Sequence, residues 1–142
     1  QFKLDCTDCP IPFANPNITT KYKVQVEDKY GCINTGEVTV IVVCNGENFF
    51  IPNTFSPNGD GSNDIFYVRG KGLFRVRSLQ IFNRLGEVVF EKREFAPNNP
   101  SLGWDGKYKG NKPKADVYIY QVELYCDVGQ IVQFAGNVAL IQ

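Results

Sequence analysis

Residues Asp116–Cys126, D-V-Y-I-Y-Q-V-E-L-Y-C, form the longest clean strand pattern in the chain. Successive side chains of a β-strand point to opposite faces of a sheet, so every second residue shares a face. The more apolar of the two faces consists of Tyr118, Tyr120, Val122, Leu124 and Cys126. We expect this face to lie against the core, and we expect a tight turn at residues 127–129.

Shorter stretches with a strand pattern lie on both sides of this one. They are residues 21–27, 37–43, 49–51, 66–69, 73–82 and 87–91 before it, and residues 130–134, 136 and 138–141 after it. The alternation within residues 73–82 slips at Ser78, which indicates a β-bulge. No helical period is present, and turn residues separate the stretches. The sequence therefore predicts an all-β fold, an antiparallel immunoglobulin-like β-sandwich of about seven strands.

The first 46 residues contain too few strands to complete a sandwich of their own. Residues 1–20 have no periodic pattern, and only two strands follow before Asn45-Gly46, which marks a boundary. We therefore interpret residues 1–46 as the C-terminal part of an immunoglobulin-like unit and residues 47–142 as a second domain. The chain opens with Gln1 and contains no methionine, which is typical of a processed product or an excised piece.

The charge and composition of the chain argue against several classes of function. Fifteen basic and fifteen acidic residues give a net charge of zero. Nucleic acids and anionic membranes bind proteins that carry a basic field, so we expect neither as a main partner. No apolar run is long enough to span a bilayer, so we expect no direct membrane insertion. Histidine, the usual general base, is absent, and this argues against an enzyme.

The five cysteines are divided unevenly along the chain. Cys6, Cys9, Cys32 and Cys44 lie early, and Cys126 alone lies late. Four cysteines in a short segment indicate an oxidising compartment, so these four are the disulfide candidates. A zinc site is the alternative, because Cys6-x-x-Cys9 has the spacing of a ligand pair, but no second Cys-x-x-Cys accompanies it. We expect Cys126 to be a small buried residue, and the odd count to leave a free thiol or a partner upstream.

The segment F-S-P-N-G-D-G-S-N-D, residues 55–64, must be a loop. Pro57 fixes its own backbone, Gly59 and Gly61 allow positive φ, and asparagine and aspartate side chains fold back on the local backbone. Apolar, extended residues flank the segment on both sides. We expect a compact loop that is held between strands.

The same loop carries oxygen-bearing side chains at every second position, namely Asn58, Asp60, Ser62 and Asp64. Donors spaced in this way can surround one calcium ion, and Asp105 could add a third carboxylate if its turn lies at the same end of the sandwich. The loop is not an EF-hand, because Arg69 stands where the bidentate acid belongs. The alternative is a metal-free turn in which Asn58 and Asp60 accept hydrogen bonds from backbone N–H groups.

Two further features have a structural and a functional interpretation. Trp104, the only tryptophan, could stack on a sugar, but beside Asp105-Gly106 it more often plugs the end of a sandwich core. Four lysines surround Tyr108, at positions 107, 109, 112 and 114. They could contact an acidic partner, although a solvated loop has the same composition.

Five short motifs follow one another along residues 49–142. They are F-S-P-N-G-D-G-x-N-D at residues 55–64, I-F-N-R-x-G-x-x-V-F at 81–90, W-D-G at 104–106, P-x-x-x-V-Y-x-Y at 113–120 and G-x-V-x-L-I at 136–141. In this order and spacing they resemble the gliding motility-associated C-terminal domain of Bacteroidota, the type B sorting domain of the type IX secretion system. Two positions depart from that pattern: Leu85 replaces a frequent aromatic residue, and Asp116 replaces a glycine or alanine. Residues 1–44, which carry T-T-x-Y-x-V-x-V-x-D-x-x-G-C at positions 19–32, resemble the tail of a PKD or immunoglobulin-like adhesin repeat.

The resemblance implies a function in protein targeting rather than in catalysis. Such domains are recognised by the outer-membrane translocon and carry a cargo to the cell surface, with help from an outer-membrane partner of the PorP/SprF type. The implied cargo is a large gliding-motility adhesin. The residues that we expect to touch the machinery are those of loop 58–64 and the terminal strand, which is Gly136, Asn137, Val138, Ala139, Leu140, Ile141 and Gln142. The alternative function is an extracellular immunoglobulin-like adhesin or carbohydrate-binding module with a calcium-stabilised loop.

Overall fold

The computed structural model describes residues 4–44, 47–111, 114–127 and 129–142. Four expectations concern residues outside these ranges: the boundary at Asn45-Gly46, the basic-cluster residue Lys112, the motif residue Pro113, and Val128 in the middle of the turn after Cys126.

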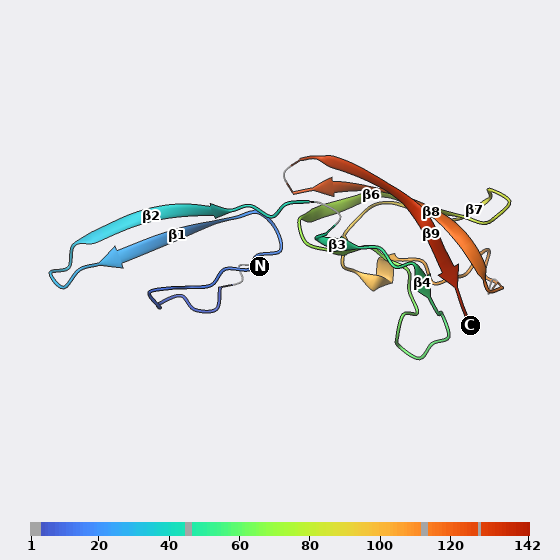
Figure 1. The fold of residues 1–142 in the computed structure, drawn as a ribbon, viewed down its shortest axis with the longest axis horizontal. Coiled ribbons are helices and arrows are strands. Elements are labelled where there is room, and N and C mark those ends of the chain that lie inside the picture. Colours follow the sequence, from blue (N-terminus) through green and yellow to red (C-terminus); the bar gives the residue numbers. More distant parts are fainter. Residues whose placement is uncertain (1–3, 45–46, 112–113, 128) are drawn as a thin grey trace.

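The described residues form nine β-strands and one short 3-10 helix (Figure 1). The strands are β1 (Thr20–Glu27), β2 (Ile33–Val40), β3 (Phe49–Phe50), β4 (Thr54–Phe55), β5 (Arg69–Gly70), β6 (Leu73–Phe82), β7 (Val88–Phe95), β8 (Asp116–Cys126) and β9 (Ile131–Leu140), and the 3-10 helix is η1 (Pro100–Leu102). The all-β prediction is confirmed. Seven of the strands, β3 to β9, follow the N-terminal hairpin, in agreement with the expected number.

A five-stranded sheet in the order β4-β9-β8-β6-β7 is the main layer of the sandwich. The predicted strand at residues 116–126 is confirmed as β8, at its centre, with antiparallel neighbours on both sides. The predicted bulge is also confirmed, because the register between β6 and β8 shifts between Val76 and Ser78. One pair departs from the expected antiparallel arrangement: β4 runs parallel to β9.

The opposing layer contains little regular structure. β3 and β5 form a two-residue antiparallel pair, and loops supply the rest. Pro52 lies between β3 and β4, where the chain leaves the β3–β5 pair and joins the main sheet. Proline lacks the N–H that a sheet ladder needs, so it favours this change of partner.

The core lies between these two layers. On β8, Tyr118, Val122, Leu124 and Cys126 are buried and Tyr120 is partly buried, so the predicted core face is confirmed. The largest fully buried side chains belong to Trp104, Phe55 and Phe66. Phe55 and Tyr118 contact Trp104, with ring centroids 5.2 and 5.0 Å from that of the indole.

Several predicted strand boundaries were wrong. β2 begins at Ile33 and ends at Val40 rather than covering 37–43, because the complete ladder with β1 overrides the low strand preference of Asn34 and Gly36. β7 continues to Phe95, where a loop was expected, because its pairing with β6 extends to Val76. Residues 66–69 form only a bridge from Phe66 to Trp104 and the start of β5. The last strand is continuous through Gly136.

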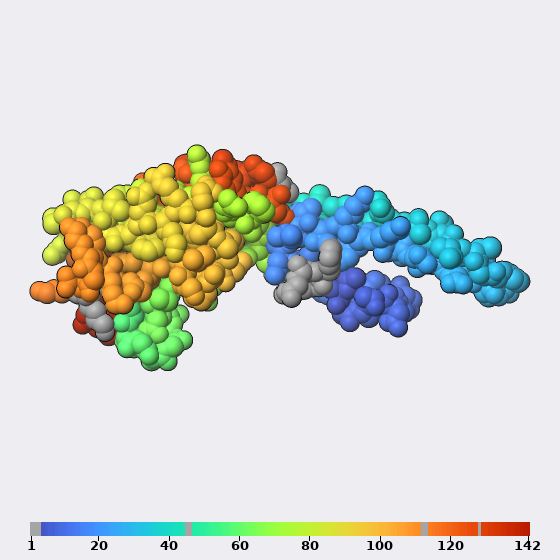
Figure 2. All heavy atoms as spheres, turned by 180° about the vertical axis from the view of Figure 1, so that it is seen from behind, coloured from blue at the N-terminus to red at the C-terminus, as the bar shows by residue number. Residues whose placement is uncertain are grey.

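β1 and β2 form a hairpin that extends from the rest of the molecule as a narrow arm (Figures 1 and 2). The side chains of Val24, Val26 and Val38 are all about half exposed on this hairpin. No helix in the described parts of the chain is long and apolar enough to cross a membrane.

Candidate functional site

The loop of residues 56–64, the turn around Asp105 and the end of the chain meet at one end of the sandwich. They line a hollow of about 540 Å³, to which the loop contributes residues 57–59, the turn contributes 105–107, and the chain end contributes Leu140 and Gln142. Figure 1 shows the loop after β4 projecting at the end where the chain terminates. Three of the five sequence motifs therefore converge on this hollow.

The Asp64 carboxylate organises the loop. Its two oxygens accept hydrogen bonds from the backbone N–H groups of Gly59 and Gly61, at 2.6 and 2.8 Å. Both glycines have φ of +86°, which aims these N–H groups inward at a backbone geometry that other residues rarely adopt. At the base of the loop, the Ser56 N–H donates to the Asn63 carbonyl at 2.9 Å.

Two further side chains of the loop, those of Asn58 and Asp60, accept hydrogen bonds from neighbouring backbone N–H groups. The Asn58 side-chain oxygen accepts from the Asp60 N–H at 3.0 Å, and the Asp60 carboxylate accepts from the Ser62 N–H at 2.7 Å. These are the bonds that the metal-free alternative requires. The loop is thus closed by its own hydrogen bonds, and calcium binding stays a prediction.

Asp105 lies at the same end of the molecule as the loop, as the calcium hypothesis required, but its carboxylate contacts Lys107. The Lys107 backbone N–H and Nζ donate to its two oxygens at 3.0 and 2.8 Å. Burial raises the pKa of the Asp105 carboxyl, but the hydrogen bonds and the charge of Lys107 outweigh it and hold the pKa below its ordinary value.

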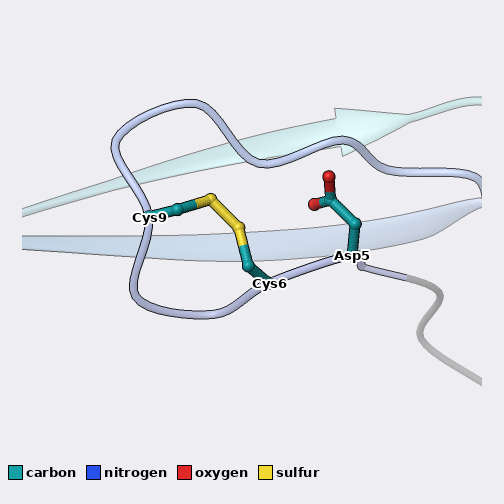
Figure 3. A group of neighbouring side chains, drawn as sticks. All are labelled: Asp5, Cys6 and Cys9. Carbon is teal, nitrogen blue, oxygen red and sulfur yellow. A yellow bond between two sulfur atoms is a disulfide. The ribbon is translucent and has the colours of Figure 1, made fainter.

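Asp60, Asp64 and Asp105 do not form a group of converging ligands. Among the described residues, the only set of three cysteine or acidic side chains with ligand atoms within 4.8 Å of one another is Asp5, Cys6 and Cys9 (Figure 3). Cys6 and Cys9 form a disulfide, so in this state they offer no thiolates to a metal.

Trp104 is fully buried, so the core-plug interpretation is confirmed and the sugar-stacking alternative for this residue is wrong. Its backbone N–H and carbonyl both bond Phe66, at 2.9 Å each, and its indole N–H donates to the Lys107 carbonyl at 2.9 Å. The neighbouring Gly106 has φ of +79°, and a Cβ at that position would lie only 2.8 Å from Pro57 Cγ. The W-D-G motif therefore fixes the turn against the loop.

The terminal strand, predicted to touch the machinery, is largely part of the fold. Val138 and Leu140 are buried in the core, at 0% and 2% exposed. The N–H groups of Ala139 and Ile141 donate to the carbonyls of Asn53 and Phe55, at 2.9 and 3.0 Å. Gly136 lies against the Tyr120 ring, while Asn137, Ile141 and Gln142 are exposed.

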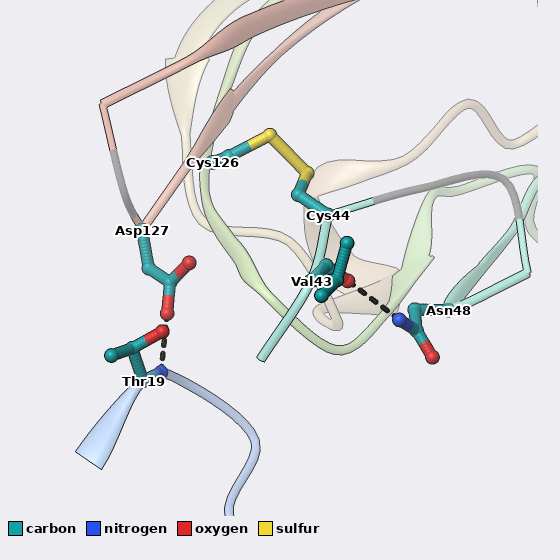
Figure 4. Close-up of a disulfide and its surroundings, with 6 residues drawn as sticks. All are labelled: Thr19, Val43, Cys44, Asn48, Cys126 and Asp127. Carbon is teal, nitrogen blue, oxygen red and sulfur yellow. Dashed lines mark hydrogen bonds between the residues drawn. A yellow bond between two sulfur atoms is a disulfide. The ribbon is translucent and has the colours of Figure 1, made fainter. Parts of the chain in front are cut away.

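The cysteine expectations need two corrections. Cys44 pairs with Cys126, 82 residues away (Figure 4). Cys126 is buried as expected, but it was not among the disulfide candidates. Cys32 was a candidate, yet it is exposed and unpaired. The odd count indicated one free thiol, but no local pattern could identify it, because the pairing depends on how β8 and residue 44 meet in three dimensions.

The lysine-rich loop has few features of a built site among its described residues. Lys107 is paired with Asp105, Lys109 lies 4.9 Å from the centre of the Tyr108 ring, and Lys114 is exposed. These contacts are local and agree with the interpretation as a solvated loop.

Comparison with known proteins assigns the second part of the chain. No curated protein matches the chain. A family model, the CHU_C type IX secretion signal domain, matches residues 49–139, which is more than half of the chain and contains the loop, the W-D-G turn and nearly all of β9. The chain therefore belongs to the family of CHU_C type IX secretion signal domains.

Proposed function

We propose that this chain directs a large surface adhesin of the gliding-motility type through the type IX secretion system of a Bacteroidota cell, with a PorP/SprF-type outer-membrane protein as its partner. The coarser part follows from the family: a type IX secretion signal domain engages the type IX machinery and marks its protein for export to the cell surface or the extracellular space. The family of type IX secretion signal domains is not a family of enzymes.

The observation that supports the proposal most directly is the meeting of three distant motif segments at one hollow. The same hollow is lined by residues 57–59, 64 and 65, by the turn of residues 105–107, and by Leu140 and Gln142 at the end of the chain. A receptor that bound this end would contact all three segments at once. The sorting motifs would then form one recognition surface rather than separate signals.

We also propose that residues 1–46 are the end of an immunoglobulin-like or PKD-like repeat and that the sorting domain occupies residues 47–142. The exposed valine face of the β1–β2 hairpin supports the first part, because a two-stranded hairpin is rarely stable without a covering layer. The carbohydrate-binding alternative has no observation in its favour, since Trp104 is buried.

The test is export of a reporter. A secreted fluorescent protein is fused upstream of residues 1–142 and expressed in a gliding bacterium and in a mutant that lacks the translocon. We expect protease-accessible fluorescence on the surface of the first strain and retention in the second. Retention in both strains, while a fusion to a native sorting domain of the host is exported, would contradict the proposal.

A further inference from the structure

Within the described parts of the chain, one edge of the main sheet is open along most of its length. β9 pairs with β8 from Tyr125↔Ile131 to Asp116↔Leu140, but on its other side it pairs with β4 over two residues only, Ala139 and Leu140 (Figure 1). In the register of β4, Pro52 would lie opposite Asn137. The chain leaves β9 at this point and continues back into β3. Among the residues that the structure describes, the edge is therefore open at residues 131–137.

The direction of the backbone groups on this edge follows from two hydrogen bonds. The N–H groups of Ala139 and Ile141 point away from β8, toward Asn53 and Phe55. Backbone direction repeats every second residue, so Ile131, Gln133, Ala135 and Asn137 direct their N–H and C=O groups to the same side. Within the described residues, these four N–H groups have no hydrogen-bond acceptor.

This edge lacks the features by which proteins usually prevent strand addition. Residues 131–140 contain no charged residue and no proline, and the register with β8 has no bulge. The opposite edge, β7, contrasts with it. There Glu91, Lys92, Arg93 and Glu94 follow one another, and Glu94 has φ of +52°. One edge of the same sheet is thus protected and the other is not.

We propose that residues 131–137 of β9 are a docking edge to which an extended strand of a component of the type IX machinery adds. This inference rests on the proposed function and deepens it, because it adds a contact in the middle of β9 to the contact proposed at the hollow. Main-chain hydrogen bonds supply the affinity in this mode of recognition, and neighbouring side chains supply the selectivity.

The chemistry of the edge defines its partner. Seven residues span about 23 Å at about 3.3 Å per residue, which suits an incoming strand of similar length. The flanking side chains of Ile131, Ala135 and Asn137 are uncharged and exposed, so a partner strand needs no charge to match them. A partner strand rich in small and uncharged residues fits this edge. A lysine or an acidic residue placed opposite Ala135 would find no opposite charge on β9.

The test compares two substitutions at one position in the reporter fusion to residues 1–142. Ala135→Pro removes an outward N–H without touching the ladder to β8, and Ala135→Ser retains it. We expect surface export to fall at least tenfold with Ala135→Pro and to match the parent with Ala135→Ser. Melting curves of the two variant proteins establish that both are folded. Parental export of a folded Ala135→Pro variant would overturn the proposal.

A photo-crosslinking residue at Gln133 gives a second measurement that does not depend on proline, and Lys92 on β7 is its matched control. We expect position 133 to crosslink, during export, to a protein that mass spectrometry identifies as part of the secretion system, and position 92 not to. A crosslink at 133 to a second copy of this chain, or equal crosslinks at both positions, would overturn the inference. If the parent fusion itself is not exported, the proposed function fails first and the inference falls with it.

Discussion

Cys44 and Cys126 are joined by a disulfide that ties the exit of the N-terminal hairpin to the last residue of β8 (Figure 4). Cys44 is buried within the same hydrophobic cluster as the core of the sorting domain. Two hydrogen bonds reinforce the junction: the Thr19 N–H donates to the Asp127 carboxylate, and the Gly72 N–H donates to the Asn17 carbonyl at 2.7 Å. A fragment that begins at residue 47 would lose all three contacts.

The first prediction concerns this disulfide. Cys44→Ser should lower the free energy of unfolding by about 2 to 4 kcal/mol, because the crosslink restricts a long loop of the unfolded chain. Denaturant unfolding of residues 1–142 with and without reductant measures the effect, and reductant should add little to the variant. Cys32→Ser is the control and should behave as the parent. Equal stability of the two variants would contradict the pairing.

The second prediction concerns Trp104. Trp104→Ala should lower the free energy of unfolding by about 3 to 5 kcal/mol, because it empties a fully buried site between Phe55 and Tyr118. Trp104→Phe should cost less, since it retains most of the apolar volume and loses the bond to the Lys107 carbonyl. Thermal unfolding followed by near-ultraviolet circular dichroism tests both. A Trp104→Ala variant as stable as the parent would show that the indole is not part of the core.

The third prediction concerns Gly106, which brings the W-D-G turn against the loop. Gly106→Ala should destabilise the domain by about 1 to 3 kcal/mol, because φ is positive and the new methyl group would meet Pro57. Gly110→Ala is a matched control: its φ is +78°, but a Cβ there meets nothing within 4 Å. A larger loss at position 106 than at 110 isolates the contact with Pro57, and equal losses would argue against that contact.

The sequence predicted the regular parts of this fold well, and the reasons are local. β8 alternates without interruption, the bulge at Ser78 interrupts a strict period, and an isolated tryptophan beside Asp-Gly suits a buried turn. The pairing of Cys44 with Cys126 and the parallel contact of β4 with β9 join residues more than 80 positions apart. Such contacts depend on the packing of the whole sandwich, and no spacing rule contains them.

The sequence predicted which residues lie at the candidate site, but it predicted their roles less well. Asn58, Asp60, Asp64 and Asp105 do lie at one end of the sandwich, but their oxygens accept hydrogen bonds from neighbouring groups, and Asp105 pairs with Lys107 two residues on. All of residues 136–142 were expected to touch the machinery, yet Val138 and Leu140 are core residues. The open part of that edge follows from the short parallel pairing of β4 with β9, which no local sequence pattern predicts.

The fourth prediction separates the two explanations of the loop. Asp64→Ala should destabilise the domain by about 1 to 3 kcal/mol in the presence of a chelator, because the N–H groups of Gly59 and Gly61 lose their acceptor. Asp64→Asn should be less destabilising than Asp64→Ala, since its one amide oxygen can still accept a hydrogen bond. Unfolding curves with chelator and with millimolar calcium measure both effects. A loss of stability that occurs only when calcium is present would show instead that the carboxylate acts through a bound ion.

The fifth prediction concerns alkaline pH. Burial raises the pKa of Tyr118, with a further contribution from Asp116 that Arg84 opposes, and burial alone raises the pKa of Tyr120. Both hydroxyls therefore ionise later in the folded state than in the unfolded chain, whose ordinary tyrosine pKa is about 10. Their contribution to stability is fully present below pH 10 and is lost as the pH rises toward the folded values.

Urea unfolding between pH 8 and pH 11 tests this dependence. The free energy of unfolding should fall above pH 10, and the fall should be smaller in a Tyr118→Phe/Tyr120→Phe double variant, which has no hydroxyl to ionise at either position. Tyr30→Phe is the matched control substitution, because Tyr30 is exposed on the hairpin. An equal slope in the parent and the double variant would mean that other groups unfold the protein at high pH.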